Sequence, residues 1–264
     1  MNEIPNLSNL SLSSVSLDMI FSETNTTLAS GTGFFWRFQN SLYLITNWHN
    51  VTGKNPQTLE SLANHGGIPD IIRFPLIKLH GFEIETSLCE VNLYFDSSRL
   101  TPAWFIHPHF KEKVDVIALE FNPPDGFNCI AINDIELGFK DFKPAVADDA
   151  FILGFPLLNK QMGLFPIWKK ASIASEPEFD FDEMPIIIVD SASRPGMSGS
   201  PVILRRNGIW LEPKSGLGTR KCFLGIYSGR IIGKTNFEAQ LGIVWKKHLI
   251  EEIIIGRTRN PSLL

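Results

Sequence analysis

The chain has 264 residues, of which 44% are hydrophobic and 20% are charged, and this is the composition of a globular protein rather than of a coiled coil, a collagen or a disordered tail. Lys and Arg number 24 against 28 Asp and Glu, a net charge of −4, and the charges are scattered along the sequence, so we expect no nucleic acid partner. The longest uncharged apolar runs, such as residues 185–189, are too short to span a bilayer, so we expect no membrane partner either.

The cysteines and the first residues bear on the compartment. Cys89, Cys129 and Cys222 are an odd and sparse set for this length, which predicts free thiols in a reducing compartment rather than a disulfide framework. Residues 1–21 contain neither the basic start nor the apolar core of a secretory signal. We therefore expect a cytoplasmic protein.

In chain order, residues 1–15 are rich in Asn, Ser and Leu without a sustained period, which predicts a flexible N-terminal arm. From there, short runs rich in Phe, Ile, Val and Leu alternate with Gly, Pro, Asn and Asp, a pattern typical of antiparallel strands in a sandwich or barrel. The predicted strands are residues 17–21, 33–38, 42–46, 71–77, 82–95, 114–121, 151–155, 186–189, 201–205, 223–227 and 242–245. Residues 39–41 are the predicted turn of a hairpin between the second and third of them.

Two features divide the chain. A polar, proline-containing stretch over residues 122–147 separates two strand-rich halves of similar length and is the predicted connection between two barrels. Near the end, apolar residues recur at helical spacing, which predicts an amphipathic helix over residues 245–256 that Gly256 ends. The predicted units are thus a first barrel over residues 16–135, a second over 136–244, and a terminal helix.

A candidate nucleophile lies in the second half. Residues 195–202 read Pro-Gly-Met-Ser-Gly-Ser-Pro-Val, which places Ser198 between two glycines directly before an apolar strand. Glycines permit a tight turn that presents a hydroxyl and leaves backbone N–H groups unpaired, as an oxyanion hole requires. Alone, the pattern also fits an ordinary turn.

The first half offers two possible partners. His49 follows a strand end and could act as a general base, although a lone histidine there is more often a surface residue. Period-2 counting places Asp115 on one face with Ile117 and Leu119. It therefore either lies at the exposed end of its strand or pairs with an imidazole. Residues 50–52 spell a glycosylation acceptor, but a glycan beside His49 would obstruct the site.

Taken together, the order His49, Asp115, Ser198 resembles that of the chymotrypsin-like (trypsin-like) serine peptidases. Residues 31–35 are similar to the family's glycine-rich strand before the histidine, and residues 106–119 to the approach to its aspartate. The likeness runs from residue 28 to residue 255 and implies an all-β fold of two six-stranded antiparallel barrels with a C-terminal α-helix.

The resemblance also implies roles. Ser198 would attack the scissile carbonyl, His49 would take and return the proton, and Asp115 would orient the imidazole, while the N–H groups of Gly196 and Ser198 would form the oxyanion hole. Met197 stands where secreted digestive members carry an acid that pairs with a newly cut N-terminus, and no Ile-Val-Gly-Gly start is present. We expect either an intrinsically formed site or control by a regulatory protein partner. Ser200 replaces a family glycine, as in bacterial and viral branches.

For specificity, the resemblance places Ala192 at the base of the substrate pocket, so cleavage after Lys or Arg is not expected. The other residues implied in substrate binding are Ser193, Arg194, Tyr227, Ser228, Gly229 and Arg230. Positive charge from Arg194 and Arg230 would favour an acidic residue before the cut, or failing that a small or medium apolar one. The alternative is that both arginines point into solvent and Tyr227 narrows the pocket.

The predicted function is that of an intracellular serine endopeptidase, regulatory or processing, that cleaves a protein or peptide substrate through an acyl-enzyme intermediate. The alternatives are a catalytically silent peptide-binding module on the same fold and a general esterase. We expect no cofactor and no metal, because His107 and His109 lack a nearby cysteine or acidic cluster that would complete a site.

Overall fold

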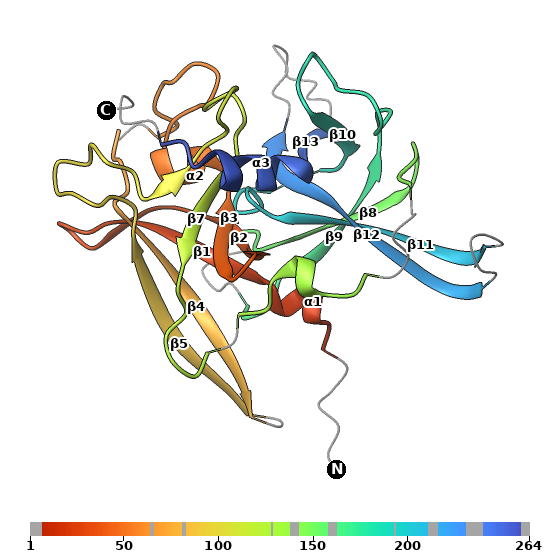
Figure 1. The fold of residues 1–264 in the computed structure, drawn as a ribbon, viewed down its shortest axis with the longest axis horizontal. Helices are drawn as coiled ribbons and strands as arrows, with labels where there is room; N and C mark the ends of the chain where they lie inside the picture. The colour runs from red at the N-terminus through yellow and green to blue at the C-terminus, as the bar shows by residue number, and fades with distance from the viewer. Residues whose placement is uncertain are drawn as a thin grey trace.

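The computed structural model describes residues 7–63, 66–80, 83–127, 129–137, 143–157, 163–192, 194–210, 216–230 and 240–259. Two antiparallel sheets lie next to each other, and the C-terminal helix crosses between them (Figure 1). This confirms the predicted all-β architecture with a terminal helix.

The first half forms a seven-stranded sheet. Its elements are α1 (Asn9–Leu12), β1 (Ser14–Phe21), β2 (Thr26–Phe38), β3 (Ser41–Thr46), α2 (Trp48–Thr52), β4 (Ile71–His80), β5 (Glu83–Asn92), β6 (Trp104–Phe105) and β7 (Ile117–Phe121). The strand order is β5-β4-β1-β2-β3-β7-β6. The sheet therefore has one strand more than predicted, because β6 is two residues long and too short to show a period in the sequence.

The second half forms the predicted six-stranded closed barrel, with the order β10-β13-β12-β11-β8-β9. After the 3-10 helix η1 (Ile132–Asp134), its elements are β8 (Asp149–Gly154), β9 (Ile167–Ile173), β10 (Ile186–Asp190), β11 (Pro201–Trp210), β12 (Gly216–Arg230), β13 (Leu241–Lys246) and α3 (His248–Gly256).

Two predicted boundaries were wrong. Within the predicted flexible arm, residues 9–12 form α1 and β1 begins at Ser14. Leu10 is 1% exposed, so burial of this side chain fixes the segment against the core. At the other end, Trp245 belongs to β13, where it pairs with Ile186 and Ile226, and the helix begins only at His248. The predicted helix started too early because Trp245 is buried as a strand residue and its apolar side chain also fits helical spacing.

The core has three parts. One cluster is formed by side chains of the first sheet that pack on one another, and a second fills the interior of the closed barrel. The third joins the halves, because Phe34 and Ile45 of the first sheet pack with Ile226 of the second and with Leu249 and Ile253 of α3. Burial of this shared apolar surface stabilises the docking of the two halves against each other. Groups from both halves can therefore be positioned against one another.

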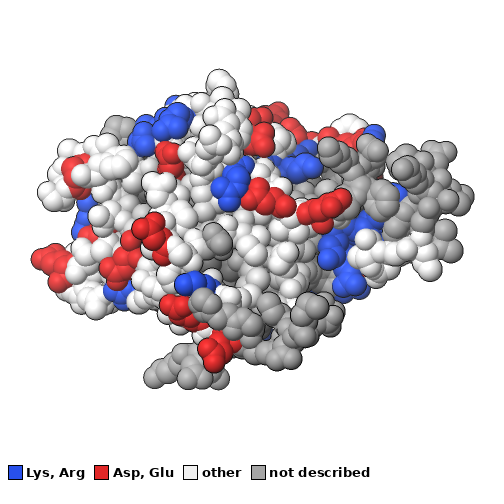
Figure 2. All heavy atoms as spheres, turned by 60° about the horizontal axis from the view of Figure 1, so that its bottom comes forward, with Lys and Arg blue, Asp and Glu red and all other residues white. Residues whose placement is uncertain are grey.

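The face drawn in Figure 2 carries acidic and basic side chains interspersed over its described residues. Among the described residues, no helix is both long and apolar enough to cross a membrane.

Candidate active site

His49 lies on α2, the single helical turn that follows β3. Trp48, fully buried in the core of the first sheet, anchors this turn. Gly53 ends it with a φ of 67° and donates its N–H to the His49 carbonyl over 2.9 Å. The predicted turn after the strand is therefore a short helix, which leaves the His49 side chain 16% exposed.

Asp115 is paired, which settles the choice between an exposed strand end and a partner. The residue is 2% exposed. Its Oδ2 lies 2.6 Å from Nδ1 of His49, and its Oδ1 accepts the His49 backbone N–H over 2.9 Å. Asn47 donates from Nδ2 to the Asp115 carbonyl over 2.6 Å. Because a carboxylate can only accept here, the proton of a neutral His49 lies on Nδ1 and Nε2 is left as the acceptor.

Ser228 adds a third hydrogen bond to this carboxylate, from its Oγ to Oδ2 of Asp115. The pairing of β12 with β13 shifts register between Tyr227 and Gly229, and a bulge of this kind redirects the side chain of the extra residue. The sequence predicted Ser228 as a substrate-binding residue. Its side chain touches Asp115, a contact that only the register could reveal, and substrate binding by Ser228 stays a prediction.

The nucleophile turn, residues 194–200, requires glycine at two positions. Gly196 and Gly199 have φ values of +91° and +86°. A Cβ on Gly196 would lie 2.4 Å from the Phe155 carbonyl oxygen, and one on Gly199 would lie 2.0 Å from that of Thr32. The glycines therefore permit both the strained turn and its close approach to the first sheet.

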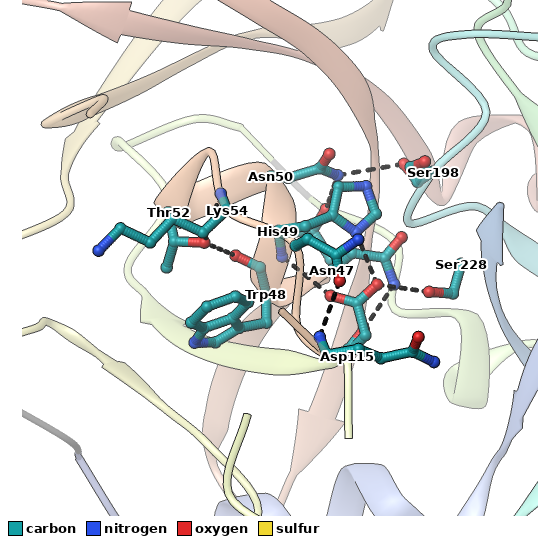
Figure 3. A network of polar contacts seen from close by, with 12 residues as sticks. Asn47, Trp48, His49, Asn50, Thr52, Lys54, Asp115, Ser198 and Ser228 are labelled. Atoms are coloured by element: carbon teal, nitrogen blue, oxygen red, sulfur yellow. Dashed lines mark hydrogen bonds and ion pairs between the residues drawn. The ribbon is translucent and has the colours of Figure 1, made fainter. Parts of the chain in front are cut away.

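The three predicted residues meet at the boundary of the two halves. In Figure 3 the His49 ring stands between the Asp115 carboxylate and Ser198. Ser198 is half-buried. The hydrogen bonds of the described residues include none between its hydroxyl and His49; such bonds often form only when substrate is present.

The two predicted oxyanion donors have no acceptor among the described residues, since neither Gly196 N–H nor Ser198 N–H enters a hydrogen bond. The carbonyls beside them are held. Pro195 O accepts from Leu157 N over 3.0 Å, and Gly196 O accepts from the Thr32 hydroxyl over 2.8 Å. Because N–H and C=O of one planar peptide point in opposite directions, the Pro195 bond sets the direction of Gly196 N–H. Both donors can serve a developing oxyanion.

The predicted substrate-binding residues are spread more widely. Ala192, Arg194 and Arg230 are exposed, whereas Ser193 lies outside the described residues. Gly229 is adjacent to the nucleophile, since a Cβ there would lie 3.9 Å from Ser198 Oγ.

Tyr227 is fully buried in the core of the closed barrel. Its ring lies against Gly242, where an added Cβ would lie 2.5 Å from Cε2. The ring therefore packs in the core of the barrel, and its effect on a substrate pocket stays a prediction.

The histidines considered as metal ligands have other contacts. His107 is 1% exposed, and its Nε2 lies 2.8 Å from Oε2 of Glu252 on α3. Its Nδ1 accepts the N–H groups of His109 and Phe110 over 3.2 and 3.0 Å. Both ring nitrogens are thus engaged, Nε2 with α3 and Nδ1 with the turn that follows His107. The described residues contain no group of three possible metal ligands.

The three cysteines are free thiols. Burial raises the pKa of Cys89 and of Cys222, and it raises the pKa of Cys129 to about 12. A raised pKa keeps a thiol protonated and therefore a poor nucleophile near neutral pH.

The family model described as a trypsin-like peptidase domain matches residues 31–209, a span that includes His49, Asp115 and Ser198. No curated protein matches the chain.

Proposed function

Because the chain belongs to the trypsin-like peptidase family, we propose that it is a serine endopeptidase with a His49, Asp115, Ser198 triad. One observation carries the proposal: the His49 ring, held by Asp115 over 2.6 Å, stands next to a serine whose own N–H and that of Gly196 have no acceptor among the described residues. Nucleophile, base, orienting acid and oxyanion donors are the parts that acyl transfer requires.

In this mechanism Ser198 Oγ attacks the scissile carbonyl while Nε2 of His49 takes the hydroxyl proton. The carbonyl oxygen becomes an oxyanion that the Gly196 and Ser198 N–H groups bind; losing one such donor typically costs about 3–4 kcal/mol in the transition state. His49 then gives its proton to the leaving amine, which departs and leaves an acyl-enzyme. Water, deprotonated by His49, hydrolyses this ester and restores the Ser198 hydroxyl.

We propose that an extended substrate lies along the end of β12. β11 accompanies β12 only as far as the pair Pro201 and Ile226, so Ser228 and Gly229 run on beside the nucleophile turn. Exposed Arg194, four residues before Ser198, and exposed Arg230, at the end of β12, support an acidic residue before the cut. The buried ring of Tyr227 supports a short side chain there rather than a large one.

We also propose a cytoplasmic processing or regulatory role. Three free, half-buried thiols are compatible with a reducing compartment. The Asn50 side chain, which heads the glycosylation acceptor, is 5% exposed and donates to the Ser198 carbonyl over 3.2 Å. A glycan on this buried amide is incompatible with the fold, which argues against a secretory route.

Labelling with a biotinylated fluorophosphonate, read by intact mass and peptide mapping, tests the proposal. Ser198 Oγ would form a bond to phosphorus, fluoride would leave, and His49 would take the proton. A single adduct on Ser198 that is absent from Ser198→Ala is the expected result. No adduct on the folded wild-type chain would favour the silent binding module. Hydrolysis of simple esters without cleavage of any member of a peptide library would favour a general esterase.

A further inference from the structure

Thr32 of the first sheet makes three hydrogen bonds to the second half, two of them to the nucleophile turn. Its backbone N–H donates to the Ser198 carbonyl over 2.8 Å. Its hydroxyl donates to the Gly196 carbonyl over 2.8 Å and accepts the Phe155 N–H over 3.1 Å. The side chain is fully buried, so one hydroxyl from the first half satisfies two backbone groups of the second.

Asn50, directly after His49, extends the same network. Its Nδ2 donates both to the Ser198 carbonyl, over 3.2 Å, and to the Thr46 hydroxyl, over 2.9 Å. Thr46 in turn donates to the Thr32 carbonyl over 2.8 Å. Space for this amide exists because Gly31 has no side chain: a Cβ there would lie 2.7 Å from Asn50 Nδ2.

These contacts hold two peptide groups that are next to those carrying the proposed oxyanion donors. The Gly196 carbonyl belongs to the peptide that leads into Met197, and the Ser198 carbonyl to the peptide that leads into Gly199. With both oxygens tied to the first sheet, the turn cannot rotate these peptides without breaking buried hydrogen bonds.

The Ser198 N–H lies in the peptide between these two tied peptides, and the Met197 carbonyl of that peptide accepts from Ser200. The Gly196 N–H lies in the peptide before them, whose Pro195 carbonyl accepts from Leu157. Because the peptides that flank it are tied to the first sheet, the Ser198 N–H is held in place before substrate arrives.

We propose that the Thr32 hydroxyl, supported by Asn50, is a positioning group that holds the nucleophile turn in its oxyanion-binding conformation from across the interface between the two halves. This inference rests on the proposed peptidase function. It supplies an intrinsic means of ordering the turn in a chain whose residue before the nucleophile, Met197, is an apolar side chain buried in the barrel core. In this proposal, hydrogen bonds from the first sheet order the turn. In the secreted digestive members, the acid that stands in place of Met197 has that part.

The test compares Thr32→Val, which keeps the shape and loses the hydroxyl, with Thr32→Ser, which keeps the hydroxyl. Thr52→Val is the matched control, because Thr52 is also buried and its hydroxyl donates only locally, to the Trp48 carbonyl over 3.0 Å. The probe is the fluorophosphonate, and the measurements are the saturating rate of Ser198 phosphonylation, the probe concentration at half-saturation and the melting temperature.

Thr32→Val is expected to lower the saturating rate by about tenfold to a hundredfold, the scale of a misplaced reacting group or a lost oxyanion donor. The half-saturating concentration should not change, and Thr32→Ser should restore most of the rate. Thr52→Val should label like the wild type even if it melts at a lower temperature. A Thr32→Val protein that labels within twofold of the wild type overturns the inference while leaving the peptidase proposal intact.

If Thr32→Val does not fold, Asn50→Ala answers the same question, because it removes one of the two donors to the Ser198 carbonyl and adds no bulk. A several-fold loss of the saturating rate at an unchanged half-saturating concentration supports the positioning role. An unchanged rate refutes it. Failure of the wild type itself to label at Ser198 would instead reject the proposed function.

Discussion

Replacing Asp115 with asparagine keeps the shape of the side chain, removes its negative charge and replaces one acceptor oxygen with an NH₂ donor. In the wild type the carboxylate accepts from His49 Nδ1, from His49 N–H and from Ser228 Oγ. An amide has one acceptor oxygen and one NH₂ donor. If the oxygen keeps the backbone N–H, the NH₂ faces Nδ1, which must then give up its proton. The imidazole would carry its proton on Nε2 and could no longer accept one from Ser198.

The expected loss in kcat/KM is about 10⁴-fold, the scale of this substitution in triads of the same order, equivalent to about 5 kcal/mol of transition-state free energy. Fluorophosphonate labelling and peptide hydrolysis should fall together, with little change in KM. Asp18→Asn is the matched control, because Asp18 also accepts a hydroxyl, that of Ser30 over 2.9 Å, but on β1 away from the site. A loss of less than tenfold in Asp115→Asn would refute the assignment of His49 as the base.

Three further outcomes are expected. Gly199→Ala should lower the free energy of unfolding by about 3 kcal/mol or more and abolish labelling, because its Cβ would lie 2.0 Å from the Thr32 carbonyl oxygen. Gly163→Ala is the control and should behave as the wild type, because its Cβ would have no atom nearer than 3.8 Å. In a peptide library read by mass spectrometry, cleavage should favour acidic or small residues before the cut, and Arg230→Ala should weaken the acidic preference; dominant cleavage after Lys or Arg would reject the pocket assignment. Treatment of the folded protein with iodoacetamide at pH 8 should leave Cys129 unmodified, because burial raises its pKa to about 12, and it should not reduce activity. Intact mass and the residual rate of peptide hydrolysis check the two outcomes. Rapid inactivation would indicate that a thiol takes part in the chemistry.

The sequence predicted most strands because their apolar runs are long enough to show. β9 was not predicted, since Lys169 and Lys170 interrupt its apolar character and only its end is buried. β6 was not predicted because two residues carry no period. Helix α2 depends on the burial of Trp48, a tertiary effect that local propensity does not encode.

At the site, the order and local patterns of His49, Asp115 and Ser198 identified the candidates. The contacts among them and their neighbours could not be predicted in the same way. Whether Ser228 points at Asp115, 113 residues away, is decided by a single register shift. The contact of Thr32 with Gly196 spans 164 residues. Such contacts depend on how two sheets dock, and no spacing along the chain expresses that.

The division of the site between two halves has a consequence for a chain cut between β7 and β8. The proposed base and orienting acid, His49 and Asp115, stay on one fragment, and the proposed nucleophile and oxyanion donors stay on the other. Each fragment alone would be inert. If the proposed activity holds, fragments that associate through the shared apolar cluster would recover it in proportion to the fraction paired, and the rate would then measure the association of the two halves.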